Sequence, residues 1–357
     1  MCNNHVKYKY ESGIEQRYMN IVFRADASKE LGIGHIMRCL ALSEELIRRE
    51  NTCYFLSRLE NDDLISRIKT NNINFNKLNG KTTLHQDLET LIKFSNNNSI
   101  DWVITDSYLI NSDYVKTLKQ HRFNVLSIDD TADIHYHSDI VLNQNIGAEK
   151  LKISAEKYTV LLQGSKYILM RDELLKREEK KENKKVETIL ISLGGAEKTD
   201  LTLEILHILE SITENIEILV VLGPFNTYYE YIKRQIEKSK NKIKLLTSPK
   251  NMADVYLEAD IAISAGGSSC YELAYFGIPN IIITIAKNQI NIAHELNHKK
   301  IGKYVGESNN LSYNKLKSTV DELIHNHPMR KMMILNGKKL VDGKGKTRVA
   351  KLMERYS

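Results

Sequence analysis

The stretch GIGHIMR, residues 32–38, is separated by seven residues from a short apolar segment, NIVFR, at residues 20–24. The apolar segment predicts a buried strand. After the stretch, apolar residues recur at helical spacing, as Ile36, Leu40, Leu42, Leu46 and Ile47. The glycines therefore mark a strand-to-helix turn, where the backbone bends tightly and can approach a ligand closely.

His35 falls at the start of the predicted helix. The positive end of the helix dipole disfavours an imidazolium there and favours a neutral imidazole, which can accept a proton as a general base. Arg38 lies one turn further on, near the same face, where it can meet an anion. The alternative is a glycine turn whose histidine only caps the helix.

The length of 357 residues predicts about two domains, each large enough for its own core. Lysine and arginine outnumber aspartate and glutamate by 51 to 45, which gives a net charge of +6. The basic residues are spread along the chain, without the clusters and aromatic platforms of nucleic-acid binding proteins. We therefore expect no nucleic-acid partner.

The cysteines are far apart and lack metal-type spacing, which is typical of a reducing cytoplasm; they are Cys2, Cys39, Cys53 and Cys270. Residues 1–20 contain no signal-peptide core, and no apolar run of about 18 residues predicts a membrane span. We expect a cytoplasmic protein without membrane insertion. The sequence leaves the oligomeric state open and is compatible with a monomer.

Strand-like and helix-like segments alternate in both halves, which favours parallel sheets covered on both faces. The first-half strands are expected at 21–24, 52–57, 102–105, 124–128 and 140–142, with helices near 35–49, 61–70, 84–95 and 112–120. The second-half strands are expected at 186–193, 216–222, 243–246, 261–264 and 280–285, with helices at 201–209, 226–238, 268–276, 290–299, 312–325 and 343–354. Ligands of such sheets bind beyond the carboxyl ends of the strands, so the cleft between the two units is the expected site.

Between the halves, Arg171–Lys185 has twelve charged residues among fifteen and predicts a solvated linker or a loose helix end. The expected division is a loosely ordered extension at 1–20, a first Rossmann-like domain at 21–160, a linker at 161–185, a second Rossmann-like domain at 186–335 and a C-terminal helix at 336–357.

Two glycine-bearing turns in the second half suggest a phosphate site. Gly266 and Gly267 follow a strand, and Ser268 and Ser269 suit the start of the next helix, whose free N–H groups and dipole attract phosphate. Glu272, one turn in, can hold ribose hydroxyls. Gly194 and Gly195 end another strand and let a phosphate approach the backbone. The alternative is a well-capped helix with no ligand.

Polar side chains also follow three strands of the first half, in Asp106-Ser107-Tyr108, Asp129-Asp130 and 143–145. They predict either helix caps or, because His35 shares their sheet edge, the lining of a pocket for sugar hydroxyls or amides. The remaining histidines show no metal-ligand pattern, and most of them are expected at the surface; they include His135, His137, His294, His298, His325 and His327. His294 lies near Asn288-Gln289, so a supporting role in the site stays open for it. We expect no metal and no cofactor.

Together these motifs resemble a family. The stretches 24–28 and 32–39 resemble the start of the UDP-2,4-diacetamido-2,4,6-trideoxy-β-L-altropyranose hydrolases of the pseudaminic acid pathway. The resemblance continues through 106–108, 128–130, 142–145, 192–195, 266–272 and Asn288-Gln289. The second half also resembles the nucleotide-binding domain of the UDP-GlcNAc transferase that makes lipid II. The implied fold is α/β of the GT-B type, two Rossmann-like parallel-sheet domains facing a central cleft.

The resemblance implies release of UDP and the free sugar, by attack of water at the anomeric carbon with inversion and with His35 as the catalytic residue. The implied substrate-binding residues are Arg24, Asp26, Gly34, Arg38, Tyr108, Asn288 and Gln289. The implied UDP-binding residues are Gly194, Gly195, Gly266, Gly267, Ser268, Ser269 and Glu272.

The chain departs from the family pattern at Ser107, Tyr271 and Lys287, where histidine, tryptophan and an acidic residue are common. These positions make the identity of the sugar less secure than the reaction class. Two alternatives stay open: a GT-B glycosyltransferase with a UDP-amino-sugar donor, and a non-catalytic nucleotide-sugar sensor.

Overall fold

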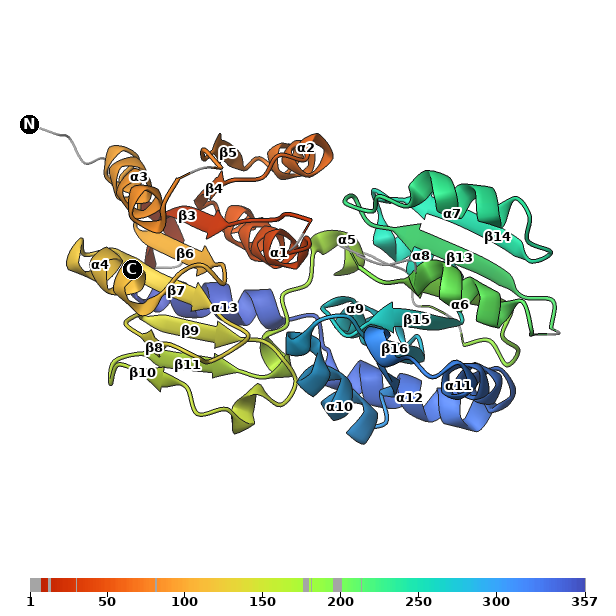
Figure 1. The fold of residues 1–357 in the computed structure, drawn as a ribbon. Helices are drawn as coiled ribbons and strands as arrows, with labels where there is room; N and C mark the ends of the chain where they lie inside the picture. Colours follow the sequence, from red (N-terminus) through yellow and green to blue (C-terminus); the bar gives the residue numbers. More distant parts are fainter. Residues whose placement is uncertain are drawn as a thin grey trace, which may run out of the picture.

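The computed structural model describes residues 8–11, 14–29, 31–80, 82–175, 180, 182–194, 201–212 and 214–356. They form two α/β domains that lie side by side, each built on a fully parallel sheet (Figure 1). The predicted class of two parallel-sheet domains is confirmed. Within the described residues, every helix is too short or too polar to span a bilayer.

The first sheet has seven strands in the order β11-β9-β7-β6-β3-β4-β5. Their bounds are β3 Asn20–Ala25, β4 Thr52–Ser57, β5 Asn74–Lys77, β6 Trp102–Asp106, β7 Asn124–Ile128, β9 Ile140–Asn143 and β11 Val160–Gln163. β3, the strand of the opening motif, lies between β4 and β6, so the strand order reverses beside it. Ligands of open parallel sheets bind at such a reversal.

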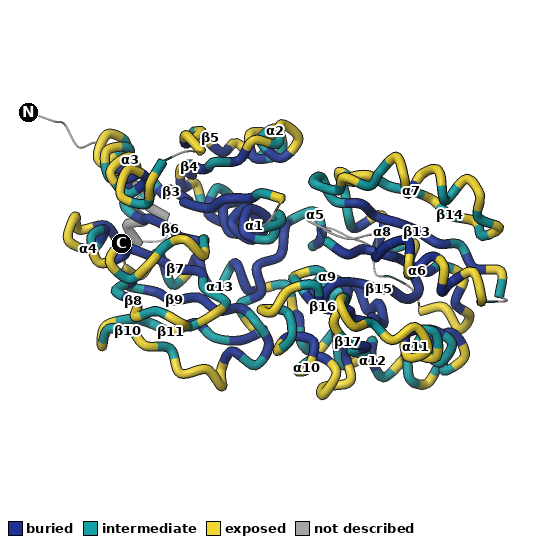
Figure 2. Tube along the Cα trace, viewed as in Figure 1, coloured by how far each residue is buried: buried dark blue, intermediate teal, exposed yellow. Residues whose placement is uncertain are grey.

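Helices cover this sheet: α1 Gly34–Arg48, α2 Asp62–Thr70, α3 Leu84–Asn97 and α4 Ser112–Gln120. α1 forms where the sequence predicts it, because Ile36, Leu40 and Leu46 all point into the main core of the domain. In Figure 2, α1 and the central strands are almost entirely buried, whereas α3 and α4 expose their outer faces.

The second sheet has six strands in the order β14-β13-β12-β15-β16-β17. Their bounds are β12 Thr188–Ser192, β13 Glu217–Leu222, β14 Lys242–Thr247, β15 Ile261–Ala265, β16 Asn280–Thr284 and β17 Gly302–Glu307. Here the strand order reverses between β12 and β15. The two glycine-bearing turns follow these two strands, so the topology brings them together.

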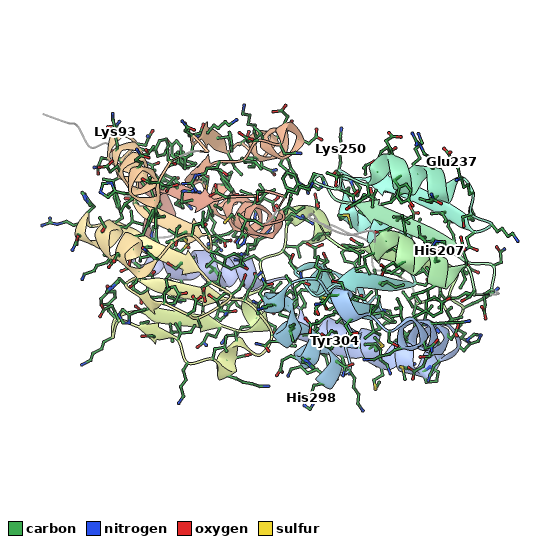
Figure 3. All side chains as sticks on the ribbon, in the orientation of Figure 1. Lys93, His207, Glu237, Lys250, His298 and Tyr304 are labelled. Carbon is green, nitrogen blue, oxygen red and sulfur yellow. The ribbon has the colours of Figure 1, made fainter. Side chains whose placement is uncertain are left out.

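The helices of the second domain are α6 Leu201–Leu209, α7 Tyr229–Ile236, α8 Met252–Glu258, α9 Ser269–Phe276, α10 Ile290–His298, α11 Tyr313–His325 and α12 His327–Leu340. Gly277 has a φ of 69° and ends α9, as its position before Pro279 predicts. Charged side chains such as Lys93 and Glu237 point outward from the helices of both domains (Figure 3).

Several elements differ from the prediction. β1 (Tyr8–Glu11) and β2 (Ile14–Arg17) form an antiparallel hairpin inside the expected loose extension. β11 extends the first sheet to Gln163, into the expected linker. β8 (His135–Tyr136) and β10 (Ser154–Ala155) form a separate two-stranded ladder. β5, β17 and α8 were not predicted, and of α12 only the part from residue 336 onward was expected.

The segment after β11 is less solvated than its charge predicts. It contains the short helix α5 (Asp172–Leu175), and Arg171 is buried, with its guanidinium paired to Glu173 and Glu272. Opposite charges thus let Arg171, at the start of this segment, be buried, whereas residues 182–185 are exposed as the charge predicts. Lys176–Glu179 and Lys181 lie outside the described residues.

The chain returns to the first domain at its C-terminal end (Figure 1). α13 (Gly345–Met353) packs against α1, and its residues Val349 and Met353 belong to the first-domain core. The expected C-terminal helix at 336–357 is therefore two elements, the end of α12 and the whole of α13. α13 is part of the first domain in space, although it follows the second in sequence.

Candidate active site

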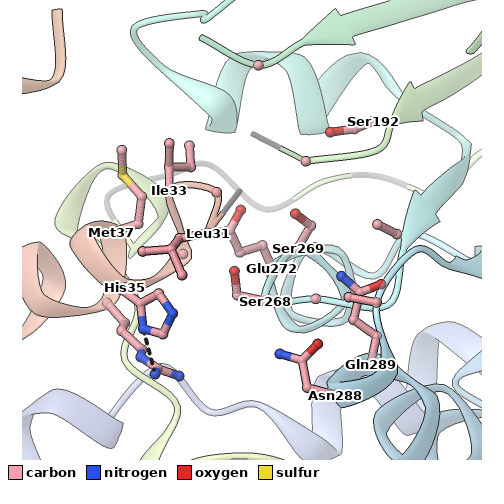
Figure 4. A pocket seen from close by; sticks show the side chains of 18 of the residues that line it. Leu31, Ile33, His35, Met37, Ser192, Ser268, Ser269, Glu272, Asn288 and Gln289 are labelled. Atoms are coloured by element: carbon pink, nitrogen blue, oxygen red, sulfur yellow. Dashed lines mark hydrogen bonds between the residues drawn. The ribbon is translucent and has the colours of Figure 1, made fainter. Parts of the chain in front are cut away.

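A cleft of about 1920 Å³ lies between the two domains. Its walls include the loops that follow the strands of both sheets, where parallel sheets bind their ligands. Figure 4 shows His35 on the first-domain side, facing Ser268 and Asn288 on the second-domain side. The GIGHIMR stretch and the turn at 267–269 therefore face one cavity.

His35, the second residue of α1, is held by a carboxylate. Its Nδ1 atom lies 2.5 Å from Oδ1 of Asp106, and both side chains are buried. Asp106 is the last residue of β6, paired in register with Ala25 at the end of β3, so the reversal of strand order places it beside the start of α1. The carboxylate favours the tautomer with hydrogen on Nδ1. In Figure 4 the other ring nitrogen faces the cleft, where it can accept a proton.

Arg38 holds the His35–Asp106 pair in place through hydrogen bonds to Asp106. Its Nε and Nη2 atoms donate to Asp106 at 2.6 Å each, and Nη1 donates to both oxygens of Asp130 at 2.8 Å. Burial alone raises the pKa of Asp106, but the charges of Arg38 and His35 and their hydrogen bonds outweigh it and lower the pKa to about 2. Asp106 is therefore an anion at neutral pH.

The sequence suggested that Arg38 can bind an anion, but the structure gives it another role. Arg38 lines the cleft, and its guanidinium is already paired with the carboxylates of Asp106 and Asp130. Arg38 instead sets the charge and position of Asp106, and through Asp106 the orientation of His35.

Tyr108 covers the His35 ring. The two ring centroids are 4.7 Å apart, with the planes at 84°. The Tyr108 hydroxyl donates to Asp130 at 3.2 Å, and Asp130 also accepts from Asn145 at 2.9 Å. Burial and the charge of Asp130 raise the pKa of Tyr108, so the hydroxyl keeps its proton. The three polar segments that follow β6, β7 and β9 thus form one connected group.

The second-domain side begins with the N-terminus of α9. Ser268 occupies the cap position, but its side chain makes no capping hydrogen bond, and the first turn of a helix leaves N–H groups without helical partners. Gly194 lies across this turn with a φ of 92°, a conformation that favours glycine. The N-terminus of α9 and Gly194 thus lie at the wall of the cleft, an arrangement suited to a diphosphate.

Glu272 lines the cleft with both oxygens already engaged. Oε1 accepts from Arg171 at 3.2 Å, and Oε2 accepts from the Tyr256 hydroxyl at 2.6 Å. These partners fix the carboxylate at the cleft wall, and each oxygen keeps a lone pair for a hydroxyl of a ligand.

Contacts between the domains bridge the cleft. The Asn288 side-chain amide donates to the Tyr108 hydroxyl at 2.9 Å. The hydroxyl of Tyr271 accepts from the backbone N–H of Ile146 at 3.0 Å and lies 3.3 Å from Oδ1 of Asn145. The family commonly has tryptophan at the position of Tyr271, and here the phenol makes a specific bond to the opposite domain.

Two expected substrate-binding residues do not line the cleft. Arg24 is buried and donates to Asp26 and to Asp87 at 2.7 Å each, and Asp26 and Asp87 also pair with Arg58. The two arginines and two aspartates balance one another's charges at the end of β3. Arg24 and Asp26 therefore stabilise the first domain and do not face the cleft. Because Asp87 and Arg58 come from distant segments, the sequence did not reveal these partners.

The glycines predicted to bind the ligand differ in whether they line the cleft. Gly34 and Gly267 line the cleft, whereas Gly266 does not; a Cβ on Gly266 would come within 3.0 Å of Gln289. Gly266 thus permits the close approach of the short helix η3 (Lys287–Gln289), which carries Asn288. Gln289 lines the cleft, and its side-chain oxygen accepts from the N–H of Ile285 at 2.9 Å. The expected UDP-binding residue Gly195 lies outside the described residues.

Sequence reasoning placed Asp106 and Asp130 at this edge but missed their link to His35 through Arg38. It also missed Tyr256 and Arg171 as partners of Glu272. The available signal was the position of each segment after a strand, which says that side chains converge but not which of them pair.

Comparison with known proteins supports this architecture. Residues 174–351 match the family model of the glycosyltransferase family 28 C-terminal domain. The chain superposes on MurG of Acinetobacter baumannii with a TM-score of 0.68 and 15% sequence identity, covering 94% of this chain and 99% of that one. At this identity the likeness concerns the fold, which is the two-domain GT-B fold.

Three relatives are similar in sequence. An uncharacterized protein of Methanocaldococcus jannaschii is 28% identical over 74% of this chain, and the chain spans about half of that relative, 55% of its length. The spore coat polysaccharide biosynthesis protein SpsG of Bacillus subtilis is 23% identical over 94% of this chain and 98% of its own. The UDP-2,4-diacetamido-2,4,6-trideoxy-β-L-altropyranose hydrolase of Campylobacter jejuni is 25% identical over 77% of this chain and 95% of its own. The chain therefore has the GT-B fold, matches the model of the glycosyltransferase family 28 C-terminal domain over residues 174–351, and resembles the UDP-sugar hydrolases of the pseudaminic acid pathway.

Proposed function

We propose that this protein is an enzyme that hydrolyses UDP-2,4-diacetamido-2,4,6-trideoxy-β-L-altropyranose to UDP and the free sugar, for pseudaminic acid biosynthesis. The observation that carries the proposal is the 2.5 Å contact between His35 and Asp106, with the free face of the ring opposite the N-terminus of α9. A base and a diphosphate-type site thus face each other across one cleft, and the hydrolase of Campylobacter jejuni is similar over most of this chain.

The division of labour follows the domains. The second domain holds UDP, with the diphosphate at the turn of residues 267–269 and at Gly194, and with the ribose beside Glu272. Tyr108 and Asn288, which meet over the cleft, lie beside the sugar. The first domain supplies the base.

The reaction is a displacement by water at the anomeric carbon. His35 accepts a proton from water at Nε2 while the water oxygen bonds to the carbon, and the bond from that carbon to the phosphate oxygen breaks with its electron pair on UDP. Asp106 stabilises the imidazolium that forms. Water attacks from the face opposite UDP, so the configuration inverts. Backbone N–H groups at the start of α9 stabilise the charge on the departing diphosphate.

A general base contributes about 10²–10⁴ in rate, so the leaving group and its electrostatic stabilisation supply most of the remainder. The proposal needs no metal or cofactor and one small-molecule substrate. We place the protein in the cytoplasm, because Cys39, Cys53 and Cys270 are free thiols.

The second candidate is a GT-B glycosyltransferase that passes the sugar to an acceptor. The observation that favours it is the match of residues 174–351 to a family model named for glycosyltransferases. The two functions differ only in what attacks the anomeric carbon.

The deciding experiment is to incubate the purified chain with the UDP-sugar in H₂¹⁸O without any acceptor. NMR should show UDP and the free sugar of inverted configuration, with ¹⁸O in the sugar and none in UDP. UDP release that begins only after an acceptor is added would establish transfer instead. Binding of the UDP-sugar without turnover, both with and without an acceptor, would show that the protein is a non-catalytic nucleotide-sugar sensor.

A further inference from the structure

Two histidines and a glutamate gather on the ladder formed by β8 and β10. Figure 1 shows this ladder at the edge of the first domain that faces away from the second, and its residues His135, His137 and Glu156 do not line the cleft. Strand pairing sets His135 opposite Ser154, and side chains two residues apart on a strand share a face. Glu156 follows Ser154 by two residues, so it reaches the same face as both histidines.

The three side chains aim at one point. Oε1 of Glu156 lies 2.8 Å from Nδ1 of His137 and 3.4 Å from Nε2 of His135. All three donor atoms lie within 4.8 Å of one another. In a tetrahedral zinc site with bonds of about 2.0–2.2 Å, neighbouring ligand atoms are about 3.4 Å apart. The observed spacing therefore needs only small side-chain rotations to hold an ion.

We propose that His135, His137 and Glu156 form a binding site for a divalent transition metal ion of the zinc class. Two imidazole nitrogens and one carboxylate oxygen are ligands that Zn²⁺ accepts, with water as the fourth. The ion takes the place of the direct contacts between the two histidines and Glu156. All three side chains are partly exposed, so the site is open to ions from solution.

The surroundings prepare the ligands. Nδ1 of His135 lies 2.9 Å from the Ser154 hydroxyl, which accepts from Nδ1–H and so leaves Nε2 free for a metal. The hydroxyl of Tyr158 donates to the carbonyl of His137 at 2.8 Å and anchors the backbone of the site.

Other histidine–carboxylate pairs of the described chain lack this arrangement. His85, His207, His325 and His327 each meet one glutamate. Within the described residues, His135, His137 and Glu156 are the group of three that can share an ion. His325, whose Nε2 lies 2.8 Å from Glu214, is therefore a matched control.

An ion bound here would link two segments whose preceding residues lie at the cleft. Residues 135–137 follow Asp130, and residues 154–156 follow Asn145, and both of these cleft residues belong to the group around Arg38. The expected effect of the metal is on the rigidity and stability of this side of the first domain, and it has no part in the proposed chemistry.

The test uses the full chain, first stripped with a chelator and then titrated with ZnCl₂ by calorimetry. We expect one ion per chain and a rise in the unfolding temperature with zinc. Co²⁺ should give the visible absorption of a tetrahedral site. The double variant H135A/H137A and the variant Glu156→Gln should lose both signals, and Ser154→Ala should weaken binding about 10–100-fold. His325→Ala should bind like the unchanged chain.

Failure to bind zinc, or equal binding by H135A/H137A and the unchanged chain, would overturn the proposal. Unfolding of the metal-free variants, compared with that of the unchanged chain, separates loss of a ligand from loss of the fold, and Ser154→Ala gives a test that removes no ligand. Hydrolysis of the UDP-sugar is measured in the same samples with and without chelator. Because the two sites share no residue, zinc binding and hydrolysis fail independently.

Discussion

His35 acquires its chemistry from residues that are distant in sequence. Asp106 comes from the end of β6, and Arg38 holds Asp106 from the next turn of α1. Arg38 is in turn tied to Asp130, so four charged or polar groups behave as one unit. Removing a member therefore alters the orientation and charge of the rest as well as its own contact.

His35→Ala tests the base directly. We expect kcat to fall by about 10²–10⁴, because a general base contributes that much. The affinity for UDP should stay within a few-fold of the unchanged protein, since UDP is expected on the opposite wall. Steady-state kinetics and UDP calorimetry check both values. Turnover within a few-fold of normal would assign the base elsewhere.

Asp106→Asn tests the orienting carboxylate and the stability that it provides. The folded-state pKa of about 2 lies below the ordinary 3.8, so the stabilisation is present above pH 4 and is lost as the pH falls through 2. It amounts to on the order of 2 kcal/mol. In urea unfolding, the difference between unchanged protein and variant should shrink from pH 5 to pH 2. A difference that is constant with pH would refute this account. The kcat should also drop, as for His35→Ala.

At the scale of elements, the site exists because both sheets reverse their strand order beside it. β3 and β6 bring His35 and Asp106 together, and β12 and β15 bring together Gly194 and the start of α9. The helices that begin at these points place His35 on one side of the cleft and Ser268 and Ser269 on the other.

Ser269→Asp tests the N-terminus of α9. A carboxylate there stabilises the helix but repels a bound diphosphate. We therefore expect UDP affinity to fall about 5–30-fold, the equivalent of about 1–2 kcal/mol, with no loss of unfolding temperature. Ser318→Asp, on the exposed face of α11, is the control that should leave UDP binding unchanged. Equal UDP affinity for both variants would place the diphosphate elsewhere.

The central elements were predictable because their residues are buried on both faces and read as apolar runs. The edge strands were not: β5 (NFNK) and β17 (GKYVGE) are half polar, and their backbone pairing is decided by a neighbouring strand. The same limit applies to the site. Strand ends predicted which loops converge, whereas the partners of His35, Arg24 and Glu272 depend on strand order and burial.

The histidine–glutamate group shows this limit most directly. His135 and His137 are two residues apart, but the third ligand is 19 residues away from His137 and reaches them only through the ladder of β8 and β10. A search for helical metal motifs therefore misses it.

At the scale of the whole molecule, the two domains meet through specific polar bonds. Tyr271 reaches from α9 to the backbone of Ile146, and Asn288 reaches Tyr108. These bonds fix how His35 lies relative to the N-terminus of α9, so we expect their loss to affect catalysis.

Tyr271→Phe removes one such bond. The buried N–H of Ile146 then loses its partner, which costs about 1–3 kcal/mol in the free energy of unfolding. We also expect kcat to fall more than UDP affinity, because closure is weakened and the UDP turn is intact. Urea unfolding and kinetics measure the two effects. Tyr313→Phe, an exposed tyrosine on α11, should change neither, and a Tyr271→Phe variant as stable as this control would contradict the role of the bond.

The return of α13 to the first domain has a consequence for how the molecule is made. Val349, Ala350 and Met353 complete a core whose first strand begins at residue 20, and the buried ammonium of Lys346 pairs there with Glu44 at 3.3 Å. During synthesis the second domain emerges before this cover exists. The first domain is therefore translated first but completes its fold last. Until α13 is made, the face of α1 that α13 covers is exposed to chaperones and to other chains.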